Sequence, residues 1–301
     1  MKKNLLKQLE KAEKLVKGSK FVRLVHNPFK YLFAICFKYF IYKINKSETI
    51  REARLFYGGK IKIALPASTD IFLTGVKSHD SEIRLTRFLI HSLKPGDHFL
   101  DIGAHFGYYS LLASELVGSA GKVYAFEPSS QNFHILNMNA NNHSNIGIFK
   151  QAVSNKVGEI NFYEFPNLYS EYSSVKIEQF EKMAWYKQNQ PVKSTVNATN
   201  IDTITSDLTF VPKIIKIDVE GSEYNVLSGA TNFLTNRKTT IAMEYVNSNR
   251  GNEEHDKAVK LLTRIGYKFY IINQSGSLET IDNINRYLDA RKLESDNIIF
   301  K

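Results

Sequence analysis

The chain of 301 residues has little of several features that define whole classes of protein. Its single cysteine, Cys36, excludes an intramolecular disulfide framework and a zinc site built mainly on thiolates. No internal repeat is present. With 43% apolar and 23% charged residues, the composition is that of a folded protein. The chain is long enough for one large domain, or two small ones, with a substantial core.

Long hydrophobic runs are also missing. Charged residues follow the basic start MKKNLL throughout, so the apolar core of a secretory signal does not appear. The most apolar stretch, YLFAICFKYFIY (Tyr31 to Tyr42), contains Lys38 and is too short to cross a bilayer as a helix. We therefore expect a cytoplasmic protein.

Nearly all of the net charge lies in the N-terminal part of the chain, and the remainder is almost neutral. Residues 1–50 hold twelve Lys and Arg against three Asp and Glu, and so carry +9 of the total charge of +10. A nearly neutral remainder argues against nucleic acid as a partner. No Asn/Asp-Pro-Pro-aromatic motif for a flipped base occurs either. We predict a basic, aromatic-rich helical arm over residues 1–50. Its residues 20–46 either contact an anionic membrane surface or pack on the main domain.

Strands and helices alternate in the rest of the chain. HFLDIGA, KVYAFEP and KIIKIDVEG are apolar strands, and helical sequence follows each of them. This pattern predicts a doubly wound α/β domain over residues 51–301, with a mostly parallel sheet and helices on both faces. Within this domain, ahead of the alternating strands and helices, IKIALP and DIFLTG are predicted to pair as a hairpin. Residues 166–193, which include the only tryptophan, interrupt the alternation and are expected to form an insertion or lid.

The stretch FLDIGAHFGYYS is the most informative, because ligands bind beyond the carboxyl ends of strands in such sheets. Gly103 and Gly107 permit a tight turn into a helix whose N–H groups are free. Asp101 precedes this turn, and Glu127 ends the next strand, where a carboxylate can bind both hydroxyls of a ribose. His105 stands where a dinucleotide motif has its second glycine, and its ring would obstruct a pyrophosphate. The pattern therefore favours S-adenosylmethionine over NAD.

Four segments in order, DIGAHFGYYS, AFEPS, QAVSNKVGEINFY and KIDVEGSEYNVLSGA, resemble the FkbM family of S-adenosylmethionine-dependent methyltransferases. The resemblance covers roughly residues 82–245. It implies a class I methyltransferase fold, Rossmann-like, with a seven-stranded sheet whose last strand is inserted antiparallel. It also implies O-methylation of a hydroxyl, often on sugars of surface polysaccharides or glycolipids, or on secondary metabolites.

Site residues follow from the same resemblance. His105 departs from it, because asparagine is expected at that position. The remaining assignments place the methionine end of the cofactor on Asp101, Gly103 and Gly107, the ribose on Glu127 and the adenine beside Ala152.

A general base is expected, because a sugar hydroxyl is a poor nucleophile at neutral pH. Asp218, at the end of the strand KIIKID, is the first candidate, followed by Glu220, Glu244 and His105. Glu220 could instead cap the next helix, and Lys216 could pair with a carboxylate. We expect no metal, although an ion bound by Asp218 with Glu244 is an alternative.

Two other functions stay open at this point. One is an NAD-dependent oxidoreductase built on the same sheet. The other is a non-catalytic, membrane-docked scaffold that has kept a nucleotide-binding fold. The sequence identifies neither the acceptor, whether a sugar or another small molecule, nor the oligomeric state.

Overall fold

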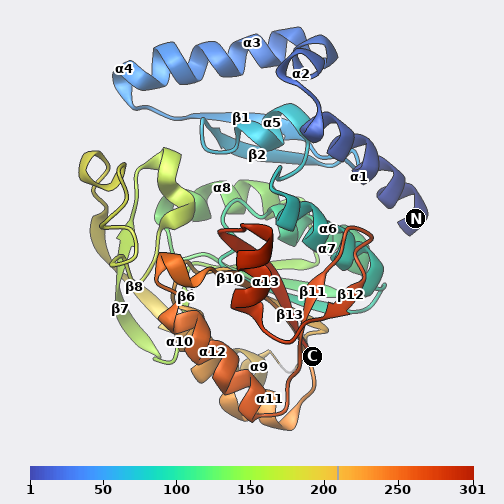
Figure 1. Cartoon of the computed structure of the whole chain (residues 1–301), viewed down its shortest axis with the longest axis vertical. Helices are drawn as coiled ribbons and strands as arrows, with labels where there is room; N and C mark the ends of the chain where they lie inside the picture. Colours follow the sequence, from blue (N-terminus) through green and yellow to red (C-terminus); the bar gives the residue numbers. More distant parts are fainter. Residues whose placement is uncertain (209) are drawn as a thin grey trace.

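The computed structural model describes residues 1–208 and 210–301, without the side chain of residue 167. A sheet of eight strands runs through the middle of the molecule (Figure 1). In spatial order the strands are β12 (Leu278–Thr280), β11 (Phe269–Ile272), β13 (Ser295–Phe300), β10 (Thr240–Val246), β9 (Ile214–Ile217), β3 (His98–Ile102), β4 (Lys122–Phe126) and β5 (Ile146–Phe149). From β10 to β5 all neighbours are parallel, and β13 lies antiparallel between β10 and β11. The predicted seven strands are thus confirmed, and β12 adds a short eighth at the edge.

Helices cover both faces of this sheet. The strands are apolar along most of their length, and successive side chains point to opposite faces, so both faces need a cover. Phe99 belongs to one apolar cluster and Leu100 to the other. The first cluster is shared with α6 (Asp80–Ser92), α7 (Tyr108–Val117) and α8 (Ser130–Ala140). The second is shared with α9 (Ile201–Asp207), α10 (Glu223–Ser228), α11 (Thr231–Asn236), α12 (Glu253–Arg264) and α13 (Ile284–Arg291). The doubly wound α/β class predicted from the sequence is confirmed.

A second sheet of three strands carries the segment predicted as an insertion or lid. Its order is β6 (Ala152–Val153), β8 (Val192–Thr199) and β7 (Gly158–Glu164), with β7 antiparallel to β8. Residues 165–191 connect β7 to β8 and contain the 3₁₀ helices η2 (Asn167–Tyr172) and η3 (Tyr186–Gln188). A further 3₁₀ turn, η4 (Ser248–Arg250), follows β10.

The hairpin before the main sheet uses other residues than predicted. β1 (Thr49–Arg54) pairs with β2 (Lys60–Leu65), which is the predicted strand IKIALP. DIFLTG instead forms the helix α5 (Thr69–Thr74), so the prediction of a strand there was wrong. Asp70 accepts a backbone hydrogen bond in the first turn, and Gly75 ends the helix with φ 77°. A short apolar run fits a strand as well as a helix. Here the hydrogen bond to Asp70 and the glycine at the end favour the helix.

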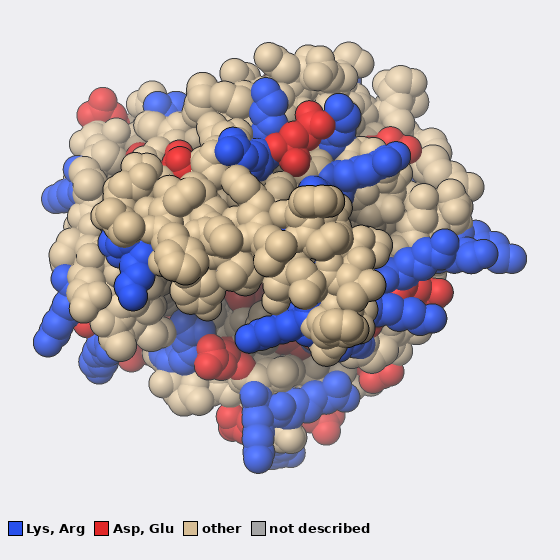
Figure 2. All heavy atoms as spheres, turned by 90° about the horizontal axis from the view of Figure 1, so that it is seen from above, with Lys and Arg blue, Asp and Glu red and all other residues tan. Residues whose placement is uncertain are grey.

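The arm is helical and divides into two parts. α1 (Lys2–Lys17) packs on α6: Leu9 is buried, and Arg87 Nη2 donates to Glu13 Oε2 at 2.6 Å. The boundary expected at residue 50 falls inside β1. No helix within the described residues is long and apolar enough to span a membrane. The outer part forms a layer above β1 and β2, seen from the side in Figure 1 and from above in Figure 2, and consists of α2 (Lys20–His26), α3 (Pro28–Cys36), the π-helix η1 (Phe37–Tyr42) and α4 (Lys43–Asn45).

If α1 is an integral part of the domain, its core contact should stabilise the whole fold. We expect Leu9→Ala to lower the free energy of unfolding by about 2–5 kcal/mol, because Leu9 is fully buried. Leu32→Ala is the matched control, and we expect a change below about 0.5 kcal/mol because Leu32 is exposed. Urea unfolding measures both. Equal effects of the two substitutions would show that α1 does not belong to the core.

Candidate active site

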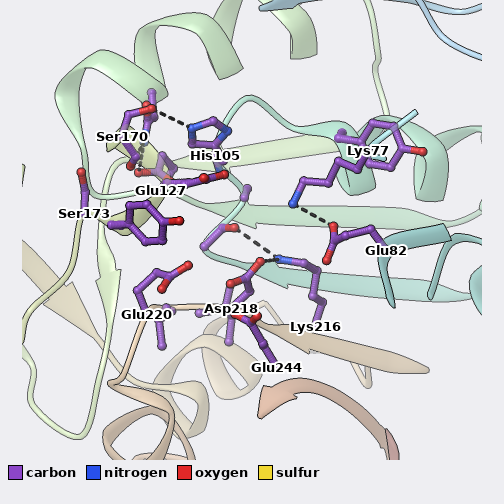
Figure 3. Close-up of a pocket in the computed structure, with 18 of the residues that line it drawn as sticks. Lys77, Glu82, His105, Glu127, Ser170, Ser173, Lys216, Asp218, Glu220 and Glu244 are labelled. Carbon is purple, nitrogen blue, oxygen red and sulfur yellow. Dashed lines mark hydrogen bonds and ion pairs between the residues drawn. The ribbon is translucent and has the colours of Figure 1, made fainter. Parts of the chain in front are cut away.

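A cavity of about 580 Å³ opens where β3, β4, β9 and β10 end (Figure 3). Its volume lies within the range of sites for small molecules and cofactors. The wall includes Gly103 after β3, Glu127 after β4, Asp218 after β9 and Glu244 in β10. The acidic strand ends singled out in the sequence therefore meet here, with the exception of Asp101.

Gly103 brings two strand ends together. It has φ 77°, and a Cβ added to it would lie 1.8 Å from the carbonyl oxygen of Asp218. Only glycine permits this approach of backbone to backbone. Gly107, with φ 87°, is the N-cap of α7 but does not belong to the described wall of the cavity.

Lys216 and Asp101 form a buried pair beneath the cavity. They lie directly opposite each other in β9 and β3, with Lys216 Nζ 3.5 Å from Asp101 Oδ1. The same ammonium lies 3.1 Å from Asp218 Oδ2, and Ser110 Oγ donates to Asp101 Oδ2 at 2.6 Å. Burial opposes the charge of Lys216, but Asp218 and Asp101 outweigh it and raise the pKa of the ammonium. The predicted pairing of Lys216 with a carboxylate is confirmed. Asp101 contacts Lys216 and Ser110 and does not belong to the described cavity wall.

Glu127 is held in place by two backbone donors. The N–H of His105 donates to Oε2 at 2.8 Å, and the N–H of Ser129 donates to Oε1 at 3.0 Å. Asn132 Nδ2 also donates to Oε1 at 3.4 Å, so Oε2 is the oxygen that keeps a further lone pair for a ligand hydroxyl. Burial raises the pKa of Glu127 to about 7, against the effect of these three donors.

His105 adopts the left-handed conformation, with φ 52°. Asparagine and histidine enter this region more readily than most residues, which explains why histidine can replace the expected asparagine. Its ring stacks on Phe106 with 3.7 Å between ring centroids, and Nε2 lies 3.1 Å from Ser170 Oγ. Burial, followed by the charge of Lys77, lowers the pKa of His105 to about 3. The ring is therefore neutral near pH 7 and is a weak proton acceptor.

Three carboxylates converge at the ends of β9 and β10. Asp218, Glu220 and Glu244 each place an oxygen within 4.8 Å of the others, and Figure 3 shows them pointing toward one another. This spacing would allow them to share one divalent cation. Burial raises the pKa of Glu220 well above its ordinary value, with Glu244 and Asp218 adding to it. Burial and then Asp218 raise the pKa of Glu244 to about 8.

Asp218 behaves differently from its two neighbours. Burial alone would raise its pKa, but Lys216 and then Lys77 reverse the effect and lower it below the ordinary value. The trio thus combines one ionised carboxylate with two that hold protons near neutral pH.

Several groups in the wall were missed by sequence reasoning. Lys77 Nζ lies 2.9 Å from Glu82 Oε2, and the hydroxyl of Tyr109 donates to the same oxygen at 2.9 Å. Glu171 comes from η2, and burial raises its pKa to about 7. Lys77 follows α5, the helix predicted as a strand, so no sequence signal pointed to it. Glu82 lies in the first turn of α6, where an acidic residue is ordinary.

Part of the cavity wall is apolar. Ala152, predicted to lie beside an adenine, is in this wall together with Phe126, Val153 and Phe162. The connection from β7 to β8 closes the side, and its Trp185 stacks on Tyr169 with 4.3 Å between ring centroids.

Comparison with known proteins gives one family and several distant relatives. Residues 101–269 match the Methyltransferase FkbM domain. The probable cobalt-precorrin-6B C(15)-methyltransferase (decarboxylating) of Saccharolobus solfataricus is 27% identical over 160 residues, or 50% of this chain and 80% of that protein. The hexuronic acid methyltransferase AglP of Haloferax volcanii is 28% identical over 155 residues, or 49% of this chain and 56% of AglP.

Solved structures are similar at lower identity. The methyltransferase FkbM from Methylobacillus flagellatus has a TM-score of 0.41 at 15% identity, covering 78% of this chain and 52% of that one. An S-adenosylmethionine-dependent O-methyltransferase from Thermotoga maritima has a TM-score of 0.40 at 14% identity, covering 83% and 76%. The chain thus spans about half the length of AglP and of the Methylobacillus protein.

The raised pKa of Glu244 makes stability depend on pH. The folded state holds this proton from the ordinary pKa of 4.5 up to about 8, whereas the unfolded chain has released it, so stability falls as pH rises across that window. The slope for one such group is at most about 1.4 kcal/mol per pH unit. We expect Glu244→Gln to be more stable than the natural chain near pH 8 and similar near pH 5.

Chemical unfolding at several pH values measures this difference. Glu159→Gln, a change of the same type at an exposed position, is the control and should leave the pH profile unchanged. A Glu244→Gln profile parallel to that of the natural chain would contradict the burial of this acid.

Proposed function

The chain belongs to the FkbM family of S-adenosylmethionine-dependent methyltransferases, and from this premise we propose that it methylates a hydroxyl group of a sugar. The acceptor would belong to a surface polysaccharide, a glycolipid or a secondary metabolite. The observation that carries the proposal is the meeting of Glu127 and the carboxylate trio in one cavity, at opposite sides of the turn at Gly103.

The lining of the cavity supports S-adenosylmethionine as its ligand. Glu127 would bind the ribose, Ala152 and Phe126 would lie against the adenine, and the carbonyls near Gly103 would receive the ammonium. The ionised carboxylate of Asp218 would favour a ligand that carries positive charge on the sulfonium and the ammonium. When bound, the cofactor supplies an electrophilic methyl group, so the residues of the chain need only align, desolvate and deprotonate the acceptor.

A base from the carboxylate trio would take the proton of the acceptor hydroxyl. Asp218 is ionised but weakly basic, because Lys216 and Lys77 outweigh its burial and lower its pKa. Glu244, with a pKa of about 8, and Glu220 are stronger bases than Asp218 once they are ionised, so the ionised form of one of them would act, and its share grows as the pH rises. We therefore propose Glu244 or Glu220 as the proton acceptor. Burial raises the pKa of both, and the negative charge of Asp218 raises it further.

Two features support a sugar as acceptor. The relative AglP is named a hexuronic acid methyltransferase. The connection from β7 to β8 also brings Tyr172 and Phe180 to the cavity, where aromatic rings can pack on a sugar. The other relative is named as a methyltransferase acting at a carbon, C(15), so a small molecule that is not a sugar is the second candidate.

The other proposed activities have less support. The family match weakens the NAD-dependent oxidoreductase, and the ring of His105, packed on Phe106, weakens it further. A non-catalytic scaffold would not need Glu127 and the carboxylate trio in one cavity. The reaction is proposed to take place in the cytoplasm, since one thiol suits a reducing compartment.

Cofactor binding can be tested without knowing the acceptor. By calorimetric titration we expect S-adenosylmethionine to bind with a roughly micromolar Kd and NAD not to bind. Glu127→Gln should weaken S-adenosylmethionine roughly 10- to 100-fold, because charged hydrogen bonds to the ribose are lost. Glu164→Gln is the matched control: its carboxylate accepts from Ser129 Oγ at 3.2 Å, beside Glu127 but outside the described cavity wall. Binding of NAD in place of S-adenosylmethionine would contradict the proposal.

The acceptor is tested separately. We expect label from methyl-labelled S-adenosylmethionine to pass to the oxygen of at least one sugar in a panel of nucleotide-linked and lipid-linked sugars, uronic acids included. Glu244→Gln should reduce the rate at least roughly 100-fold, as removal of a general base does. Glu159→Gln should keep the natural rate. A product methylated on carbon or nitrogen, identified by NMR, would contradict O-methylation.

A further inference from the structure

The outer layer of the arm presents an unusual surface. The chain has no acidic residue between Glu13 and Glu48, and residues 20–46 contain six Lys and Arg. Among the described residues, nine of the thirteen exposed large hydrophobic side chains lie within residues 21–44. Phe29 is 85% exposed and Ile44 is 84% exposed. Apolar side chains at this density, free of acidic neighbours, indicate a binding surface.

One side of this layer already has its partner within the molecule. Phe37 and Tyr42 are buried, and Phe33 packs against Phe72 of α5 with 6.1 Å between ring centroids. Lys30 Nζ donates to the carbonyl of Phe72 at 3.1 Å. The two expectations for residues 20–46 are therefore not exclusive, because the helices pack on the domain with one side and leave the other side apolar and exposed.

We propose that this outer surface, formed by Phe21, Val25, Phe29, Phe40 and Ile44 with Lys20, Lys38, Lys43 and Lys46, docks on an anionic phospholipid bilayer. Figure 2 looks onto this layer and shows a broad ridge of uncharged atoms with Lys and Arg along its margins. All nine side chains are exposed, and among the described residues none of the four lysines forms an ion pair with a carboxylate.

The positive charge of the four lysines favours anionic lipid as the partner of this surface. Apolar side chains would enter the headgroup region, while free lysines at the margins would contact anionic headgroups. A nucleic acid would engage the lysines but would leave Phe29 and Ile44 in water. A membrane satisfies both sets of side chains.

The layer also lies next to the cavity. Leu168 of η2 packs against the apolar cluster that contains Phe37 and Tyr42, and η2 contributes Ser170 and Glu171 to the cavity wall. Docking would therefore hold the side of the cavity formed by η2 close to the membrane surface, which suits an acceptor attached to lipid.

Vesicle flotation with the full chain tests the proposal. We expect binding to vesicles of phosphatidylcholine with phosphatidylglycerol, weaker binding to phosphatidylcholine alone, and a decrease as salt is raised. The triple variant Phe29→Ser, Phe40→Ser, Ile44→Ser should lose binding. The control Val157→Ser, Val192→Ser removes exposed apolar residues elsewhere and should bind normally. Replacing Lys38, Lys43 and Lys46 by Gln should weaken binding roughly fivefold for each lysine.

Folding of each variant is checked by its thermal transition and by titration with S-adenosylmethionine, neither of which involves the outer surface. Failure to bind S-adenosylmethionine would thus be distinct from failure to dock. Natural chain that does not float, or a triple variant that floats equally well, would overturn the proposal. A dimer seen by light scattering and abolished by the triple variant would also overturn it, because a second copy would then cover this surface.

Discussion

The structure of the site depends on a lysine buried in the middle of a parallel sheet. Lys216 lies in β9 with its ammonium shared between Asp101 of β3 and Asp218 at the strand end, and the carbonyl of Gly103 completes the set at 3.4 Å. Removing Lys216 would leave both carboxylates without their shared counterion, and loss of one partner from a buried ion pair is strongly destabilising. The pair therefore fixes β3 against β9 and holds the turn at Gly103 where the cavity begins.

This constraint divides the carboxylates of the site by role. Asp218 lies beside Lys216, which lowers its pKa, whereas burial and repulsion by neighbouring carboxylates raise the pKa values of Glu220 and Glu244. The wall of the same cavity also includes the apolar residues Ala152, Phe126 and Phe162. A ligand that combines an aromatic base with positive charge would use both kinds of residue. In the FkbM family that ligand is S-adenosylmethionine, and the raised pKa of Glu244 is the reason why we propose it, in its ionised form, as a base for a hydroxyl acceptor.

The sequence predicted the sheet, its helices and most strand-end residues, because apolar periodicity and glycine positions are local properties. It did not predict the helix at DIFLTG, where six residues fit either structure. Lys77 and Glu171 were missed because they reach the cavity from the loop after α5 and from η2, and only tertiary packing brings them there. For Asp101 the sequence indicated the position in the motif but not the direction of the side chain. That side chain contacts Lys216 and Ser110 and is not part of the described cavity wall.

A crystal structure of the chain with S-adenosylhomocysteine would test the central claim most directly, because it locates the cofactor without knowledge of the acceptor. The account predicts ribose hydroxyls within hydrogen-bonding distance of Glu127, the adenine against Ala152, and the sulfur facing the carboxylates of Asp218, Glu220 and Glu244. A nucleoside bound elsewhere, or bound with its sulfur directed away from these three acids, would contradict it.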